Sequence, residues 1–306
     1  MNQKTTPSSG FSKRRFIKSV TPIIWLLPSL ILITVIVIFP IYEMFVTSIS
    51  EVSRSGIRKE LNGLKNYINL LNSDTFLLVL KNTLIWTIAV VGISTILSLA
   101  IAVLLNQDFP GRKLVRAALI IPWAVSLIIT AAIWKYMFDF NYGTLNLILS
   151  KLGIIKDNIY WLANASTSFP AMIGVGIFVT IPFTTFVMLS GLQSISNDLY
   201  EAASVDGAGA WRKFFSITLP LLKPSLMVST VLNTIYVFNS FPIVWTITRG
   251  DPVNQTDLVV TYLYKLAFES KKMGEAAAIS TISFCILLLF AIVYVSLLMR
   301  GEKSDV

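Results

Sequence analysis

Residues 193–220 read QSISNDLYEAASVDGAGAWRKFFSITLP, a polar stretch that connects two long apolar runs. Asn197 or Asp198 can cap a helix that begins near Leu199, because a short polar side chain accepts a hydrogen bond from the free N–H groups of a first turn. Gly207 follows where such a helix would end. The stretch therefore predicts a helix of roughly ten residues within a loop.

One face of this predicted helix is made of small residues. Leu199, Ala202, Ala203 and Asp206 follow the i, i+3, i+4, i+7 spacing that places side chains on one side of a helix. The two alanines would let another surface approach the backbone closely. Glu201 lies in the first turn, either as a docking group or as a solvated loop charge.

A second amphipathic segment follows the glycines. Its aromatic and basic side chains alternate in a way that is typical of a short helix at a membrane surface, leading to Pro220. The segment contains Trp211, Arg212, Lys213, Phe214, Phe215 and Ile217.

The rest of the chain is dominated by apolar runs, each close to or above the 20 or so residues that cross a bilayer as a helix. Only 13% of the residues are charged, whereas a soluble domain has about 25%. We therefore predict an all-α integral membrane protein with six transmembrane helices. The predicted spans are 21–49, 77–105, 115–138, 169–192, 224–246 and 274–299.

The distribution of basic residues predicts the orientation. The first 18 residues contain five lysines and arginines and no acidic residue, which favours a cytoplasmic N-terminus and an uncleaved first span. With six spans, the expected organisation is a cytoplasmic tail at 1–20, a membrane domain at 21–299 with a cytoplasmic loop at 193–223, and a cytoplasmic tail at 300–306. The net charge of +9 is scattered over short connections, so nucleic-acid binding is not expected.

The composition also excludes several kinds of chemistry. The chain has no histidine and one cysteine, Cys285, and it contains no phosphate-binding Gly-x-x-x-x-Gly-Lys-Ser/Thr loop. Histidine-dependent catalysis and histidine metal sites are therefore excluded. We expect no enzyme activity, no metal site and no cofactor in this chain.

The polar stretch resembles a known motif in three parts: Glu201-Ala202-Ala203, then Asp206-Gly207-Ala208, then Ile217-Thr218-Leu219-Pro220. Their order, their spacing and their position before the penultimate span are similar to the EAA loop of ABC importer permeases. The Asp-Gly-Ala version resembles the carbohydrate branch, the binding-protein-dependent inner-membrane components of the maltose, trehalose and multiple-sugar type. Many sugar permeases have a glycine triplet where this chain has Arg249-Gly250-Asp251.

The resemblance implies a type I ABC importer permease fold in a prokaryotic cytoplasmic membrane, surrounded by lipid. It also implies partners: a second homologous permease, two ATPase subunits that bind ATP and magnesium, and an extracytoplasmic solute-binding protein. The residues expected to couple transport to the ATPases are Glu201, Ala202, Ala203, Asp206 and Gly207.

Polar residues within apolar spans are candidates for the transport path, since such residues are costly in a membrane. Aromatic faces, amides and hydroxyls would suit an uncharged sugar, while bonding between helices is the other interpretation of each residue. The candidates in the fifth span form one arc, Ser229, Asn233, Tyr236 and Ser240, with Asn239 beside it. The candidates in the third span form a second arc, Trp123, Ser126, Thr130 and Trp134.

Two other classes of function stay open at this point: an ABC permease for another solute, and a secondary transporter. An ABC permease for a sugar phosphate would need a basic group in its path, and one for a polyamine would need buried carboxylates. Neither predicted arc contains a charged residue, although Lys135 borders the third-span arc. A secondary transporter would need no ATPase-docking loop and would often have acidic residues within its spans.

Overall fold

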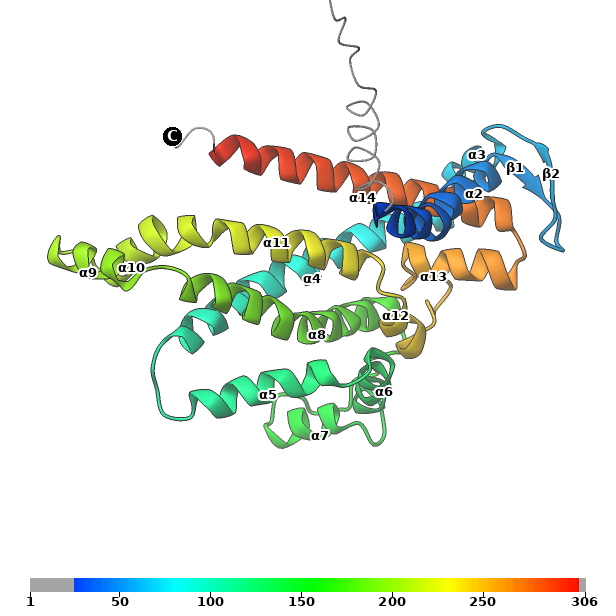
Figure 1. Ribbon diagram of the computed structural model, residues 1–306. Coiled ribbons are helices and arrows are strands. Elements are labelled where there is room, and N and C mark those ends of the chain that lie inside the picture. The colour runs from blue at the N-terminus through cyan, green and yellow to red at the C-terminus, as the bar shows by residue number, and fades with distance from the viewer. Residues whose placement is uncertain (1–24, 303–306) are drawn as a thin grey trace, which may run out of the picture.

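The computed structural model describes residues 25–302, which form a bundle of long helices with short helices at both ends (Figure 1). The predicted tail 1–20 and residues 303–306 lie outside the described residues. The elements are η1 (Thr34–Ile38), α2 (Phe39–Ser48), β1 (Ser50–Val52), β2 (Arg58–Leu61), α3 (Lys65–Leu71), α4 (Asp74–Asn106), α5 (Arg112–Ala124), α6 (Leu127–Met137), α7 (Thr144–Lys151), α8 (Ala165–Gln193), α9 (Asn197–Val205), α10 (Ala210–Lys213), η2 (Phe214–Thr218), α11 (Leu219–Phe238), α12 (Phe241–Ile247), α13 (Val259–Tyr264), η3 (Lys265–Glu269) and α14 (Met273–Glu302).

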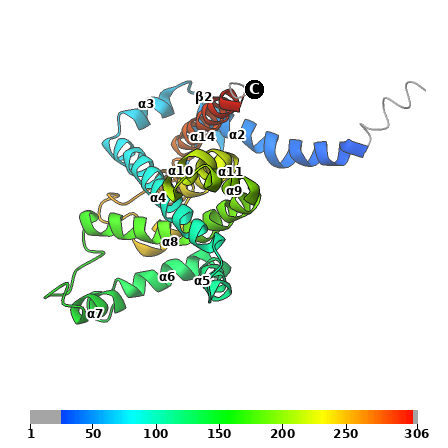
Figure 2. The same cartoon turned by 90° about the vertical axis from the view of Figure 1, so that its left-hand side faces the viewer.

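The prediction of an all-α membrane protein is confirmed. Within the described residues, five helices are long and apolar enough to cross a membrane, and the bent pair α5 and α6 meets the same criterion only when its two helices are taken together. The small antiparallel pair β1–β2 is the one sheet in residues 25–302. The first span extends away from the other helices in Figure 2, and only its α2 end packs on α14, where Phe45 meets Phe284 edge to face at 5.9 Å.

The prediction of a single transmembrane helix over 115–138 is wrong. α5 and α6 meet at an angle of 98°, because Val125 is extended (ψ of 142°) and Ser126 also has a non-helical ψ, of 136°. The break follows Pro122 by three residues, and proline weakens the end of a helix by removing one N–H donor. Hydropathy does not distinguish a broken apolar run from a continuous one.

The limits predicted for the fifth span are also wrong. The helix ends at Phe238, because Pro242 has no N–H and its ring excludes the carbonyl four residues earlier. At the other end, the segment predicted as a separate surface helix belongs to the same helical stretch, Ala210–Phe238. The π-helical turn η2 precedes Pro220 and accommodates the missing donor without breaking the helix.

The packed centre of the bundle lies where α4 contacts α8 and α11. Trp86 of α4 is fully buried there, and its indole Nε1 donates a 3.0 Å hydrogen bond to the carbonyl oxygen of Val237, at the end of α11. Ser98 of α4 donates at 3.1 Å to the carbonyl oxygen of Ile181, beside Pro182 of α8. These bonds fix the helices whose other faces line the candidate site.

Candidate functional site

The helix predicted in the polar loop is present as α9, at the end of the bundle opposite α12 (Figure 1). Its cap is not Asn197 or Asp198, as predicted, but Ser196, whose hydroxyl accepts a 3.3 Å hydrogen bond from the backbone N–H of Asp198. Gly207 follows the helix with a φ of +76°, a conformation that only glycine adopts at little cost. The loop therefore has the shape that its capping and turn residues predict.

α9 presents an exposed surface while it rests on the helix that follows. Leu199, Glu201, Ala202 and Asp206 are exposed, whereas Ala203 is half-buried. Glu201 is therefore accessible to a partner, and its role in coupling stays a prediction.

Two side-chain bonds connect α9 to the helical stretch Ala210–Phe238. The hydroxyl of Tyr200 lies 2.9 Å from Oγ1 of Thr218. Nζ of Lys213 donates to Oγ of Ser204 at 2.7 Å. These bonds hold α9 against the beginning of the long helix.

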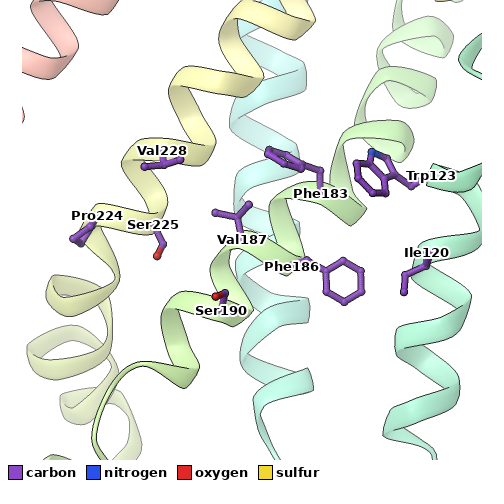
Figure 3. Close-up of a pocket in the computed structure, with 9 residues that line it drawn as sticks. All are labelled: Ile120, Trp123, Phe183, Phe186, Val187, Ser190, Pro224, Ser225 and Val228. Atoms are coloured by element: carbon purple, nitrogen blue, oxygen red, sulfur yellow. The ribbon is translucent and has the colours of Figure 1, made fainter. Parts of the chain in front are cut away.

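Two adjacent cavities lie between α5, α8 and α11. The larger has a volume of about 650 Å³ and the smaller about 350 Å³, and both are lined by Trp123 and Phe183. Figure 3 shows these two rings beside each other, with a centroid separation of 6.4 Å. At the α9 end of the larger cavity, Ser190 and Ser225 add hydroxyl groups from α8 and α11.

Gly191 brings α8 and α11 together beside the larger cavity. A Cβ atom at this position would lie 2.2 Å from Oγ of Ser225 and 2.8 Å from Cδ1 of Leu222. No side chain fits between the helices there, so glycine sets their separation.

Asn233 and Tyr236 of α11 line the smaller cavity, together with Thr180 of α8. Asn233 is 3% exposed, and its Nδ2 donates to Oγ1 of Thr184 at 2.8 Å. Tyr236 is 53% exposed. Asn233 thus both bonds a neighbouring helix and faces a cavity, so the two interpretations of this residue are compatible.

The other fifth-span candidates lie elsewhere. Ser229 is buried and donates to the carbonyl oxygen of Leu226 within its own helix. Asn239 faces a different cavity, of about 270 Å³, which α13 and α14 also line. Ser240 is buried at the start of α12, so the predicted arc does not continue to it as one helix face.

The predicted third-span arc is wrong because the helix bends within it. Trp123 remains on α5 at the cavities, whereas Ser126 is exposed at the bend. Thr130 is buried on α6, and Trp134 packs edge to face on Phe178, with ring centroids 5.4 Å apart. Only Trp123 of this set lines either of the two cavities.

Sequence reasoning missed the contribution of α8. This helix supplies Thr180, Phe183 and Ser190 to the cavities, and it supplies Thr184 as the partner of Asn233. The spacing of Thr180 and Thr184, one helical turn apart in an apolar run, was a usable signal.

Comparison with known proteins bears on this arrangement. Residues 94–300 match the family described as the binding-protein-dependent transport system inner membrane component. The chain belongs to this family of ABC transporter permeases.

Among the similar proteins, a probable ABC transporter permease protein of Brucella suis biovar 1 is 48% identical to this permease, over 92% of this chain and 98% of the relative. The trehalose/maltose transport system permease protein MalF of Thermococcus litoralis is 37% identical, over 92% and 95% of the two chains. The crystal structure of a bacterial ABC transporter for import of the acidic polysaccharide alginate matches with a TM-score of 0.81 at 22% identity, over 94% of this chain and 99% of the other.

These comparisons confirm the predicted family and the type I permease fold. The chain is a multi-pass inner-membrane component of a transporter rather than an enzyme. Residues 94–300 include α9 and all residues of the two cavities. Both candidate regions therefore lie in the part of the chain that the family shares.

Proposed function

We propose that this permease carries an uncharged carbohydrate through the cavity between α5, α8 and α11. The observation that carries the proposal is the continuous helix from Ala210 to Phe238. One end of it bonds to α9, and the other end presents Asn233 and Tyr236 to a cavity. The helix thus connects a surface for a partner with a surface for a solute.

The chemistry of the cavity walls favours a neutral solute with hydroxyl groups. Trp123 and Tyr236 offer ring faces for sugar C–H groups, and Asn233 and Ser225 offer hydrogen-bonding groups. Among the described side chains, no charged residue lines either cavity. The similarity to a trehalose/maltose permease supports the same class of solute.

We propose that α9 docks in two separate ATPase subunits, since the chain has no phosphate-binding loop of its own. ATP and magnesium would be held by those subunits, and the exposed Glu201 would pair with a basic group there. Residues Ala202 and Ala203 would allow close contact, and Asp206 and Gly207 would end the docking helix.

Two further partners and an orientation complete the proposal. Trp123 and Tyr236 are more than half exposed beside the cavities, so a second homologous permease would close the open side. The family description supports delivery of the solute by a binding protein. With the basic first 18 residues inside, both termini and α9 face the cytoplasm.

The alternative solutes lack matching groups. A sugar phosphate would require a basic side chain at the cavities, and a polyamine would require carboxylates. In the described part of the chain, neither kind of side chain lines either cavity. A secondary transporter would have no use for an exposed docking helix.

The test is uptake of labelled trehalose, maltose, glycerol 3-phosphate and spermidine by cells that lack this gene, complemented with wild type, Glu201→Lys or Asn233→Ala. We expect one sugar to enter with wild type and not with Glu201→Lys, because this substitution reverses the docking charge. Asn233→Ala should raise the KM for that sugar by about tenfold, the equivalent of one lost hydrogen bond. Full uptake by cells complemented with Glu201→Lys would contradict the docking role of Glu201. If only the uptake of glycerol 3-phosphate or spermidine required this gene, the proposal of a sugar as the solute would be contradicted.

A further inference from the structure

A separate cavity of about 410 Å³ lies at the C-terminal end of α6, at the end of the bundle away from α9 (Figure 1). Its lining differs from that of the cavities described above, because it combines charged and aromatic side chains. Those that matter here are Lys135, Tyr136, Asp139, Phe140, Tyr160 and Trp161.

The course of α6 places this cavity at a membrane surface. α5 runs beside α8 along the bundle, and α6 turns from it by 98°, so α6 lies across the bundle (Figures 1 and 2). Ile129, Ile133 and Tyr136 of α6 are 54%, 52% and 78% exposed. A helix in the membrane plane with apolar exposed residues and nearby tyrosine and tryptophan is typical of the interface between acyl chains and head groups.

The two charged groups of the cavity leave bonding capacity free. Nζ of Lys135 donates to the carbonyl oxygen of Thr246 at 3.2 Å, which leaves two of its three donors. Oδ1 of Asp139 accepts the backbone N–H groups of Asn141 and Tyr142, both at 2.9 Å. Among the ion pairs of the described residues, none joins Lys135 to Asp139.

The cavity therefore offers a cation in the last turn of α6, Lys135, and an anion two residues beyond the end of that helix, Asp139. A rigid aromatic wall stands beside them, since Phe140 stacks on Tyr160 with ring centroids 3.6 Å apart and an angle of 6°. A ligand with both charges would satisfy both groups, whereas a purely anionic ligand would meet the carboxylate of Asp139.

We propose that this cavity binds the head group of a membrane phospholipid of the phosphatidylethanolamine type. Lys135 pairs with the phosphate and Asp139 accepts hydrogen bonds from the primary ammonium, while Tyr136 and Tyr160 contact the start of the acyl chains. The proposal requires only that the chain spans a membrane, so it is independent of the transported solute.

The test is native mass spectrometry of the full chain in detergent, titrated with phosphatidylethanolamine or phosphatidylglycerol. We expect wild type to bind phosphatidylethanolamine about tenfold more tightly, since phosphatidylglycerol lacks the ammonium group. Lys135→Gln should lower the affinity for both lipids by about tenfold, which corresponds to the loss of one charge-assisted hydrogen bond. Asp139→Asn should weaken the binding of phosphatidylethanolamine alone and so remove the preference for this lipid over phosphatidylglycerol. Asparagine is chosen because it keeps the Oδ1 acceptor that holds the turn.

The matched control is Lys156→Gln, which makes the same charge change at an exposed position in the loop before Tyr160. It should leave both affinities unchanged. Equal binding of the two lipids by wild type, or equal affinities of Lys135→Gln and Lys156→Gln, would refute the proposal. Competition between trehalose and phosphatidylethanolamine would also refute it and would identify a saccharide pocket instead.

Discussion

The bond between Tyr200 and Thr218 gives a direct test of how α9 is held on the long helix. The two hydroxyl oxygens are 2.9 Å apart and partly buried, so Tyr200→Phe removes one neutral hydrogen bond and keeps the ring. The expected cost is about 1 kcal/mol of docking free energy. Thr218 Oγ1 keeps a long contact, 3.5 Å, with the carbonyl oxygen of Lys213, which limits the penalty.

A loss of about 1 kcal/mol corresponds to a roughly fivefold larger population of undocked α9. Backbone amides of α9 that exchange through local opening should therefore exchange about fivefold faster. The measurement is hydrogen exchange of the full chain in detergent, with Tyr142→Phe as the control, because Tyr142 is 91% exposed in the loop before α7.

A double-mutant cycle separates this bond from general loosening. Thr218→Val should accelerate exchange in α9 by a similar factor, and Tyr200→Phe combined with Thr218→Val should add little further acceleration. Unchanged exchange in Tyr200→Phe, or fully additive effects in the double variant, would refute the reasoning. In the assembled transporter, the same variant should lower the amount of sugar moved per ATP hydrolysed.

Two predictions concern the packing that shapes the cavities, and both are measured by thermal unfolding in detergent. Gly191→Ala should destabilise the chain by about 1–3 kcal/mol through overpacking against Ser225. Addition of Ser225→Gly should recover part of this loss, and no recovery would contradict the contact. Trp86→Phe should cost about 1–3 kcal/mol, since it removes the bond to the Val237 carbonyl oxygen and leaves a void; an unchanged melting temperature would contradict that role.

Several features of this permease could be predicted from sequence because they depend on neighbouring residues. The length of an apolar run determines whether it spans a membrane, and the described part of the chain has helices at all six predicted spans. The helix α9 follows from capping and turn residues within about ten positions. The three-part motif around Glu201 identified the family for the same reason.

Other features depend on contacts between residues far apart in the chain. The cavity is assembled from Trp123, Phe183 and Asn233, each on a different helix, and only packing decides which helix faces meet. Trp86 and Val237 are 151 positions apart, so no local pattern could predict their bond. The bend after Val125 and the end of α11 at Phe238 placed Ser126 and Ser240 away from their predicted arcs. Hydropathy records how apolar each residue is, whereas the path of the backbone through a break depends on tertiary contacts.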